Sequence, residues 1–203
     1  MLGFFIKGGW LMIPLGICSI LALAIIIERF ISLKIIESKS ERFVEKIRSV
    51  ISSSENRKVD KIFALCEMTP ISLARILKAG LEKRVKGKEE IKEAIQDVGS
   101  EEIPYLERRL KILGTITAIA PLIGLLGTVV GMIRAFNVIT VQGIGDPGAL
   151  AGGIAVALYT TAFGLGIAIP CLIFYNYFTH RTERFVRKLE SFSSEFLELL
   201  MGR

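Results

Sequence analysis

The sequence predicts an all-α integral membrane protein with three transmembrane helices and long helical cytoplasmic extensions. Hydrophobic residues make up 51% of the 203 residues, and the mean hydropathy of +0.52 is high for a protein that folds in water. The apolar residues gather in three blocks, each long enough to cross a hydrocarbon core of about 30 Å. The expected segments are an N-terminus, a first span, a charged helical region, a second span, a link, a third span and a charged tail, over residues 1–9, 10–27, 28–111, 112–136, 137–149, 150–177 and 178–203.

The first block, residues 10–27, begins at Trp10 and is followed by Glu28 and Arg29. A cleaved signal peptide is the alternative to a retained span, because the block is short and N-terminal. Only Lys7 precedes the block, however, and no small-residue cleavage site follows it. An amphipathic apolar run continues the helix instead, so the sequence favours a retained span.

Residues 28–111 have the pattern of soluble helices, with apolar residues at helical spacing on otherwise charged faces. Residues 52–54, all serine, and the Thr69–Pro70 pair are expected to interrupt these helices. The basic stretch 83–88 is expected to form a solvated turn near the membrane surface. The region contains no catalytic motif and no glycine-rich phosphate loop, so we interpret it as helical scaffolding.

The second span, residues 112–136, has no ionisable residue before Arg134. Small and polar residues recur along one face at helical spacing, while most of the large apolar residues lie elsewhere. The members of this stripe are Thr117, Pro121, Gly124, Thr128, Gly131 and Ala135. Such a stripe lets another helix approach closely or lines a polar path, and the pattern leaves both interpretations open.

The third span, residues 150–177, carries a second stripe of small residues, with Thr160 beside it: Gly153, Ala157, Thr161, Gly164 and Ala168. Pro170 is tolerated there because neighbouring membrane helices can compensate for the lost backbone bond. Glycines and Pro147 in the link 137–149 are expected to break the helix. Close helix packing is expected at Pro121, Gly124, Gly127, Gly131, Gly153 and Gly164.

The distribution of charge predicts the topology. Nearly all lysines and arginines lie in residues 28–111 and 179–203, so these segments are expected in the cytoplasm and the N-terminus outside. The net charge of +6 is therefore explained by orientation in the membrane and not by nucleic-acid binding. Membrane lipids are the expected surroundings of the spans.

Cysteine and histidine usage predicts no metal centre, no disulfide framework and no cofactor. The three cysteines are far apart in the sequence, form no CxxC pair, and two of them lie in apolar spans. His180 is the single histidine and is expected at the membrane–water interface.

Thr128 and Thr161 are expected at similar depth on the facing stripes of two antiparallel spans. Each hydroxyl alone would ordinarily bond a carbonyl of its own helix. Two hydroxyls on adjacent small faces favour a polar path, with Thr160 as a further member. No Asp, Glu, Lys or His lies in the central part of any span, and threonine does not titrate near neutral pH. Proton-coupled work would therefore need an acid from a second protein.

The three blocks resemble the MotA/TolQ/ExbB proton-channel family, and ExbB and TolQ most. The similarity rests on WLMIPLGICSILALAIIIERF at 10–30, APLIGLLGTVVGM at 120–132 and GGIAVALYTTAFGLGIAIP at 152–170. It implies an inner-membrane subunit with a periplasmic N-terminus and a cytoplasmic C-terminus. It also implies a homo-pentamer around the spans of ExbD- or TolR-like partners, whose membrane aspartate exchanges protons beside the threonines that match Thr128 and Thr161.

Proton motive force would then drive TonB-dependent outer-membrane import through a TonB-like protein, or the Tol envelope system through a TolA-like one. The sequence departs from the family at Val156, where relatives often carry glutamate, so the pore's polarity would rest on the threonines. A passive membrane scaffold remains the main alternative, and replacing Thr161 with valine would separate the two. A solute-transporter subunit and a membrane enzyme are less favoured, because no broken helix with a buried charge and no catalytic constellation is visible.

Overall fold

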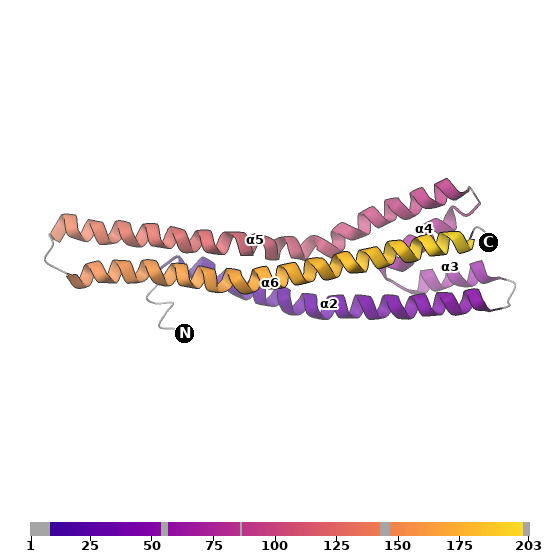
Figure 1. Ribbon diagram of the computed structural model, residues 1–203, viewed down its shortest axis with the longest axis horizontal. Helices are drawn as coiled ribbons and strands as arrows, with labels where there is room; N and C mark the ends of the chain where they lie inside the picture. Colours follow the sequence, from indigo (N-terminus) through magenta and orange to yellow (C-terminus); the bar gives the residue numbers. More distant parts are fainter. Residues whose placement is uncertain (1–8, 54–56, 86, 143–146, 201–203) are drawn as a thin grey trace. The chain divides into compact units, whose positions relative to one another are not determined.

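The computed structural model describes residues 9–53, 57–85, 87–142 and 147–200. These residues form five helices and, within those ranges, no strand (Figure 1). The helices are α2 (Met12–Ser52), α3 (Lys58–Met68), α4 (Ser72–Glu82), α5 (Lys88–Gln142) and α6 (Pro147–Leu200). Three of them, α2, α5 and α6, are long and apolar enough to cross a membrane. The predicted all-α membrane fold with three spans is therefore confirmed.

The helix ends follow local chemistry at several positions. The serine run closes α2 at Ser52, and the break at Thr69 and Pro70 separates α3 from α4, as expected. Gly87 precedes α5 with φ of +111°, a left-handed conformation that glycine adopts without strain. Of the stretch 83–88 expected to form a turn, Lys83, Arg84 and Val85 do so, whereas Lys88 already begins α5.

The link between the second and third spans is shorter than predicted. Helix α5 continues through Gln142, and α6 already begins at Pro147, so residues 137–142 and 147–149 are helical. Pro147 therefore starts a helix where we expected it to break one. Proline fits the first helical position, because its missing N–H would have no partner there and its φ is already helical. Gly143, Gly145 and Asp146 lie outside the described residues.

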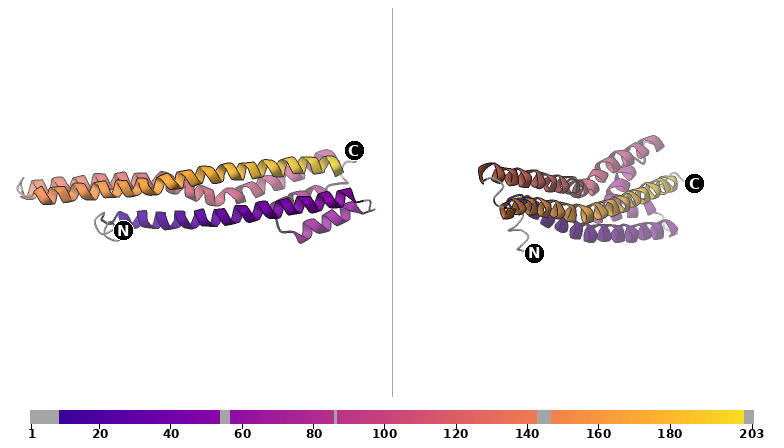
Figure 2. Two further views of the ribbon diagram at one scale, coloured as in Figure 1. Left: turned by 60° about the horizontal axis from the view of Figure 1, so that its bottom comes forward. Right: turned by 60° about the vertical axis from the view of Figure 1, so that its left-hand side comes forward.

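The chain divides into two compact units, which we describe separately. The span unit comprises residues 1–28 and 109–178, and the charged unit comprises residues 29–108 and 179–203. In the span unit, α5 and α6 run antiparallel and side by side (Figures 1 and 2). Large apolar side chains such as Ile20, Leu122 and Ile169 are exposed there, as expected for helices surrounded by lipid or by other helices.

The charged unit has a conventional apolar core. Helix α4 buries seven of its eleven residues against the other helices, and its apolar residues recur at helical spacing. Among the largest fully buried side chains are Ile47, Leu77 and Phe196. The core also includes Phe43, Ile62, Cys66, Leu73, Leu106, Phe185, Leu189 and Phe192.

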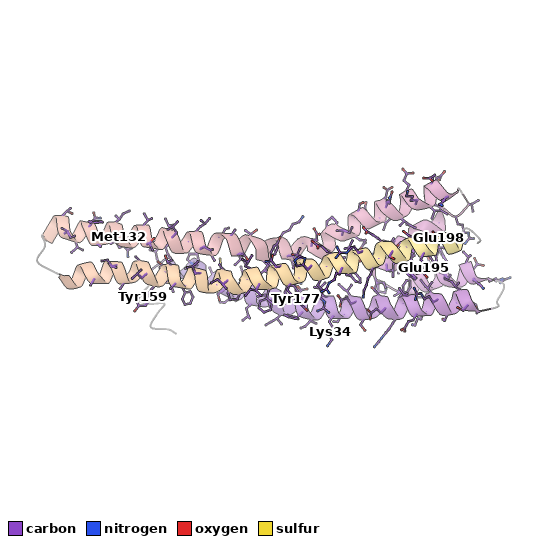
Figure 3. The ribbon with its side chains drawn as sticks, in the orientation of Figure 1. Lys34, Met132, Tyr159, Tyr177, Glu195 and Glu198 are labelled. Atoms are coloured by element: carbon purple, nitrogen blue, oxygen red, sulfur yellow. The ribbon has the colours of Figure 1, made fainter. Side chains whose placement is uncertain are left out.

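Ion pairs and hydrogen bonds join helices at the edges of this core. Arg181 of α6 binds Glu37 of α2 through two nitrogens, at 3.0 and 2.6 Å. Arg29 is 4% exposed, and its Nη1 donates to the Leu106 carbonyl oxygen at 2.8 Å. Figure 3 shows how densely long side chains are distributed along this unit.

Candidate site in the membrane spans

Helices α5 and α6 meet in the span unit through their smallest residues, along a line that we call the seam. A Cβ atom on Gly124 would lie 3.0 Å from the Thr161 Cα, and one on Gly164 would lie 2.6 Å from the Ala120 carbonyl oxygen. At Gly131 the added Cβ would lie 2.8 Å from the Gly153 carbonyl oxygen. Backbone-to-backbone approach of this kind requires the absence of side chains. The seam comprises Ala120, Gly124, Gly127, Gly131, Ala135, Gly153, Ala157, Thr160, Thr161 and Gly164.

Thr161 makes a hydrogen bond across the seam. Its Oγ1 lies 2.9 Å from the Gly124 carbonyl oxygen, and because a carbonyl can only accept, the hydroxyl is the donor. In the regular pattern of α5 the same carbonyl also accepts the backbone N–H of Thr128. The structure therefore brings the two predicted threonines to one carbonyl group, although it does not join their hydroxyls to each other.

Thr128 is half-buried at the edge of the seam. Its hydroxyl donates to the Leu125 carbonyl of its own helix, at 2.6 Å. This is the local bond that a threonine in a membrane helix commonly makes. Pro121, two turns earlier on the same edge, is also half-buried, and its missing N–H leaves the Thr117 carbonyl without the usual helical donor.

Thr160 lies in a different environment from Thr161. Its side chain is fully buried, and its hydroxyl donates to the Ala157 carbonyl at 2.8 Å. A Cβ on Gly127 would lie 2.1 Å from that hydroxyl oxygen, so Thr160 fills the space that Gly127 leaves. In this arrangement Thr160 packs two helices together and is not open to a path.

A second contact of the span unit involves residues that sequence reasoning did not connect. An ideal Cβ on Gly9 would lie 3.8 Å from Nη1 of Arg134 and 3.9 Å from Cγ1 of Val156. Trp10 lines the same small hollow of about 10 Å³. Spacing alone gave no signal for this contact, because the residues just before α2 meet α5 and α6 only in three dimensions. The hollow lies on the Thr160 side of the seam, whereas Thr161 is one residue, or about 100°, further around α6.

The centre of the buried face of α5 is shifted from the predicted stripe. Gly124, Gly131 and Ala135 of the stripe are buried, but so are three residues that the stripe did not include: Ile116, Ala120 and Gly127. Thr117 and Thr128 are only half-buried. Close contact favours glycine and alanine, so Thr117 and Thr128 lie at the edge of the interface, whereas Thr160 fits at its centre because Gly127 leaves space for it.

The arrangement contains hydroxyls and carbonyls but no titrating centre. Within the described residues, no group of three His, Cys, Asp or Glu side chains is placed to hold a metal ion. An ion pair in the span unit joins Arg109 to Glu28, which flank the predicted second and first spans. Chemically, the seam and its edge can donate and accept hydrogen bonds at membrane depth.

Comparison with known proteins identifies the family. The model of the MotA/TolQ/ExbB proton channel family matches residues 70–191. A Synechocystis sp. protein named as a biopolymer transport protein ExbB-like 1 is 35% identical over 177 residues, which are 85% of this chain and 68% of that protein. The Aquifex aeolicus biopolymer transport protein ExbB is 38% identical over 44% of this chain and 61% of its own length.

The Tol-Pal system protein TolQ of Pseudomonas aeruginosa is also 38% identical, over 50% of this chain and 44% of its own length. Similarity thus extends to proteins with ExbB names and to proteins with TolQ names. With the family model matching more than half of the chain, the protein belongs to the MotA/TolQ/ExbB proton channel family.

Proposed function

We propose that this chain is the channel-forming subunit of a proton-driven motor in the inner membrane, with its N-terminus in the periplasm and its C-terminus in the cytoplasm. In this proposal it works as a homo-pentamer around an ExbD- or TolR-like single-span protein, whose membrane aspartate carries the proton. Three findings support it: the family, the absence of an acid from the central part of each span, and a hydroxyl edge built on the Gly124 carbonyl.

The hydrogen bond from the Thr161 hydroxyl to the Gly124 carbonyl, one helical turn before Thr128, is the observation that carries the proposal. Thr161 donates to this carbonyl, and Thr128 donates to the Leu125 carbonyl, so the single hydrogen of each hydroxyl is already engaged in a hydrogen bond to a backbone oxygen. Both therefore present lone pairs to any further group. A protonated carboxylic acid is a hydrogen-bond donor, and such an edge would hold it at membrane depth.

An ionised carboxylate would need a different arrangement of the same atoms. A bare carboxylate in hydrocarbon costs several kcal/mol or more, and a hydroxyl that turns its hydrogen toward it lowers that cost. The Thr161 hydroxyl can turn about its C–O bond, whereas the buried Thr160 hydroxyl has no access to a partner. Thr161 and Thr128 are therefore the proposed pathway residues, and Thr160 is assigned to packing.

We propose two candidate systems for the work that proton flow drives. The first candidate is TonB-dependent outer-membrane import, favoured by the ExbB-like name of the relative that aligns with 85% of the chain. The second candidate is the Tol envelope system, favoured by the 38% identity to a TolQ protein. In either system, the partner would be a TonB- or TolA-like protein.

The test is proton flux in liposomes that contain this chain together with the ExbD- or TolR-like protein of the same organism. Thr161→Val should reduce proton flux at least tenfold, because it removes the hydroxyl while keeping the side-chain shape. Thr161→Ser should retain most of the flux. Thr115→Val is the matched control, since Thr115 is exposed and its hydroxyl bonds only its own helix, at the Lys111 carbonyl.

A passive scaffold gives the opposite result. If Thr161→Val conducts as well as the parent while the complex stays assembled, the stripes only pack helices, and the proposed pathway is wrong. Assembly is measured separately by native mass spectrometry, so that loss of the complex is not mistaken for loss of conduction.

A further inference from the structure

One charged side chain of the span unit stands apart from all the others. Arg134 of α5 is the only Asp, Glu, Lys, Arg or His in the predicted second span, and the predicted third span contains none. Its side chain forms no ion pair or hydrogen bond with another residue that the structure describes. A charge on a membrane helix is costly, so such residues are ordinarily paired or functional, and the first question is what partner it has.

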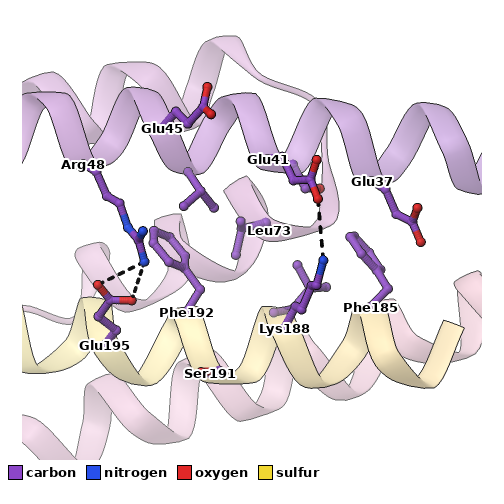
Figure 4. A pocket seen from close by; sticks show the side chains of 13 residues that line it. Glu37, Glu41, Glu45, Arg48, Leu73, Phe185, Lys188, Ser191, Phe192 and Glu195 are labelled. Atoms are coloured by element: carbon purple, nitrogen blue, oxygen red, sulfur yellow. Dashed lines mark hydrogen bonds and ion pairs between the residues drawn. The ribbon is translucent and has the colours of Figure 1, made fainter. Parts of the chain in front are cut away.

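Charged side chains of the charged unit commonly find partners within the chain. Figure 4 shows a pocket of that unit in which Lys188 approaches Glu41 at 3.5 Å and Arg48 binds Glu195 at 3.0 Å. These pairs are open to water, where a charge without a partner costs little. Arg134 lies among apolar helices instead, so a missing counter-ion has a larger effect there.

Arg134 lies at the level where the hydrocarbon core of a membrane ends. Helix α5 rises about 35 Å from Lys111, the last charged residue before the second span, to Arg134. This length is close to the hydrocarbon thickness of about 30 Å. Trp10 lines the same small hollow as Arg134 and is 59% exposed, and tryptophan is enriched at this boundary. Both residues therefore mark the level of the lipid headgroups.

The direction of the Arg134 side chain places its charge on the lipid side of this boundary. Each Cα–Cβ bond of a helix is tilted toward the N-terminus of that helix, which for α5 is the end farther from Arg134. Consistently, Arg134 lines the hollow together with Gly127 and Val130, which precede it by one to two turns. The guanidinium is therefore directed back along the span, where lipid phosphates are the nearest anions.

The surface around the guanidinium is apolar and open. Trp10 is exposed, and Ile133, next to Arg134 in the sequence, is 54% exposed. Acids are scarce on this side of the membrane, because residues 1–9 and 137–149 contain only Asp146, which lies outside the described residues. The chain thus presents a cation at the headgroup level, on a surface that suits lipid chains.

Arg134 does not face the hydroxyl edge of the proposed proton pathway. At about 100° per residue, Arg134 and Thr128 lie about 120° apart around α5, on opposite sides of the seam. The hollow beside Arg134 is completed by Gly9 and Trp10, which precede α2. A partner's carboxyl group held beside Thr128 and Thr161 would be separated from the guanidinium by the packed helices, so this acid is not the counter-ion that we infer.

We propose that Arg134 and Trp10 form a binding site for the phosphate of an anionic phospholipid, in the leaflet at which α2 begins. A guanidinium offers two parallel N–H donors to phosphate oxygens, and an indole suits the boundary between headgroup and acyl chain. A zwitterionic lipid carries its own ammonium group, which competes with Arg134 for the phosphate, whereas an anionic lipid does not.

The proposed site has a defined place in the membrane and a limited dependence on the function proposed above. Under the proposed orientation, the leaflet is the periplasmic one. The site requires only that the chain crosses a bilayer, and it does not depend on proton conduction, on a partner protein or on the number of copies. Its effect is to fix the level of α5 against the headgroups, through one side chain that reaches a lipid phosphate.

Trp10 is the single tryptophan of the chain, so its fluorescence reports on the site directly. The full-length chain is reconstituted into phosphatidylcholine vesicles with a rising fraction of brominated phosphatidylglycerol or, in parallel, of brominated phosphatidylcholine. Bromine quenches tryptophan on contact, so the two curves give the relative affinity of the two lipids beside Trp10. The proposal expects phosphatidylglycerol to bind about fivefold more tightly, the effect expected of one basic side chain near a membrane surface.

Substitutions assign the preference to Arg134. Arg134→Gln should bring the two quenching curves together, because glutamine keeps polar atoms but has no charge. Arg134→Lys should retain most of the preference, since it keeps the charge and loses only the paired donors. Lys34→Gln is the matched control: Lys34 is an exposed cation of α2 far along the helix from Trp10, and its loss should leave the quenching unchanged.

Three results would overturn the proposal. Equal quenching by the two lipids in the parent chain would show that the site does not select an anionic headgroup. A preference that survives Arg134→Gln would assign it to another cation. Loss of the preference when millimolar inorganic phosphate is added would mean that the site takes a free anion and not a lipid. Because proton flux is not a readout here, failure of this proposal and failure of the conduction proposal are distinguishable.

Discussion

At the scale of single residues, neighbouring positions of the span unit have two different roles, close packing and polarity. Glycines allow the backbones of α5 and α6 to touch, and threonines at the edge keep hydroxyls at the same depth. The Gly124 carbonyl serves both, because the close approach at this glycine is what brings the Thr161 hydroxyl within 2.9 Å. Packing and polarity are therefore coupled at this position.

Gly164 and Gly166 offer a matched test of the close approach. At Gly164 a Cβ would lie 2.6 Å from a backbone oxygen that cannot move aside, whereas at Gly166 it would meet nothing within 4 Å. Gly164→Ala should therefore destabilise the chain by about 1–3 kcal/mol, the usual cost of overpacking. Gly166→Ala should change stability little. Thermal unfolding in one detergent measures both, and equal effects would contradict the seam.

Arg134 and Val156 line the same small hollow beside Gly9, and this makes a second prediction. Both side chains border the same point beside Gly9, so Val156→Glu should place a carboxylate within reach of the guanidinium. A coupling of about 1 kcal/mol is expected between close charges of this kind. A double-mutant cycle with Arg134→Gln measures it in unfolding experiments. Simple additivity of the two substitutions would show that the groups do not meet.

The limits of sequence reasoning are visible in these same residues. Periodicity predicted the small stripes on both spans, because close packing and glycine spacing are local in sequence. It left the buried Ile116 out of the stripe and did not give Thr160 and Thr161 different roles, since spacing gives angles around a helix and not the line where a partner touches. The hollow beside Arg134 is completed by Gly9 and Trp10, which are far away in sequence.

At the scale of elements, the charged unit is held by helix faces whose ion pairs sit at the edge of an apolar core. The Arg181–Glu37 pair joins α6 to α2 at 2.6 Å, with both side chains less than a third exposed. The hydrogen bond from Arg181 holds the pKa of the Glu37 carboxyl below its ordinary value of 4.5, while burial opposes the shift.

The lowered pKa of Glu37 gives the pair a defined pH dependence. A carboxyl whose pKa falls on folding stabilises the fold fully at a pH above its pKa in the unfolded chain. This stabilisation is lost as the pH falls through its pKa in the folded chain. Glu37→Gln should therefore cost about 1–2 kcal/mol at pH 7 and progressively less below pH 4.5. Unfolding experiments at several pH values between pH 7 and below pH 4.5 measure this cost. A cost that stays constant into acid would exclude the ion pair as its cause.

Cys66 gives the charged unit a chemical probe of its core. Burial raises the pKa of this thiol to about 11, so the thiolate that reacts with maleimide is scarce at pH 7. Labelling of Cys66 in the folded chain should be at least a hundredfold slower than labelling of Met68→Cys, because Met68 is 83% exposed on the same helix. Comparable rates would mean that α3 detaches readily from the core.

At the scale of the whole molecule, composition predicted three membrane helices because the hydrophobic thickness of a bilayer is a fixed length. Apolar residues at helical spacing in the charged regions also predicted long helical extensions, and α2, α5 and α6 do continue as single helices well beyond the apolar blocks. Apolar residues of these extensions, such as Phe43 and Phe185, are buried in the core of the charged unit. Sequence patterns therefore predicted the three long apolar helices better than they predicted the ends of these helices.

The missing acid leads to the last prediction, which concerns the complete chain. A membrane helix without Asp, Glu, Lys or His in its central part has no group that takes up and releases protons near neutral pH. Liposomes with this chain alone should thus show no gated proton flux, and addition of the single-span partner should create it. Replacing the partner's membrane aspartate with asparagine should abolish the flux, because asparagine keeps the shape but cannot ionise. Gated flux through the chain alone would show that its hydroxyls, with water, conduct protons unaided, and the proposed division of labour between two proteins would be wrong.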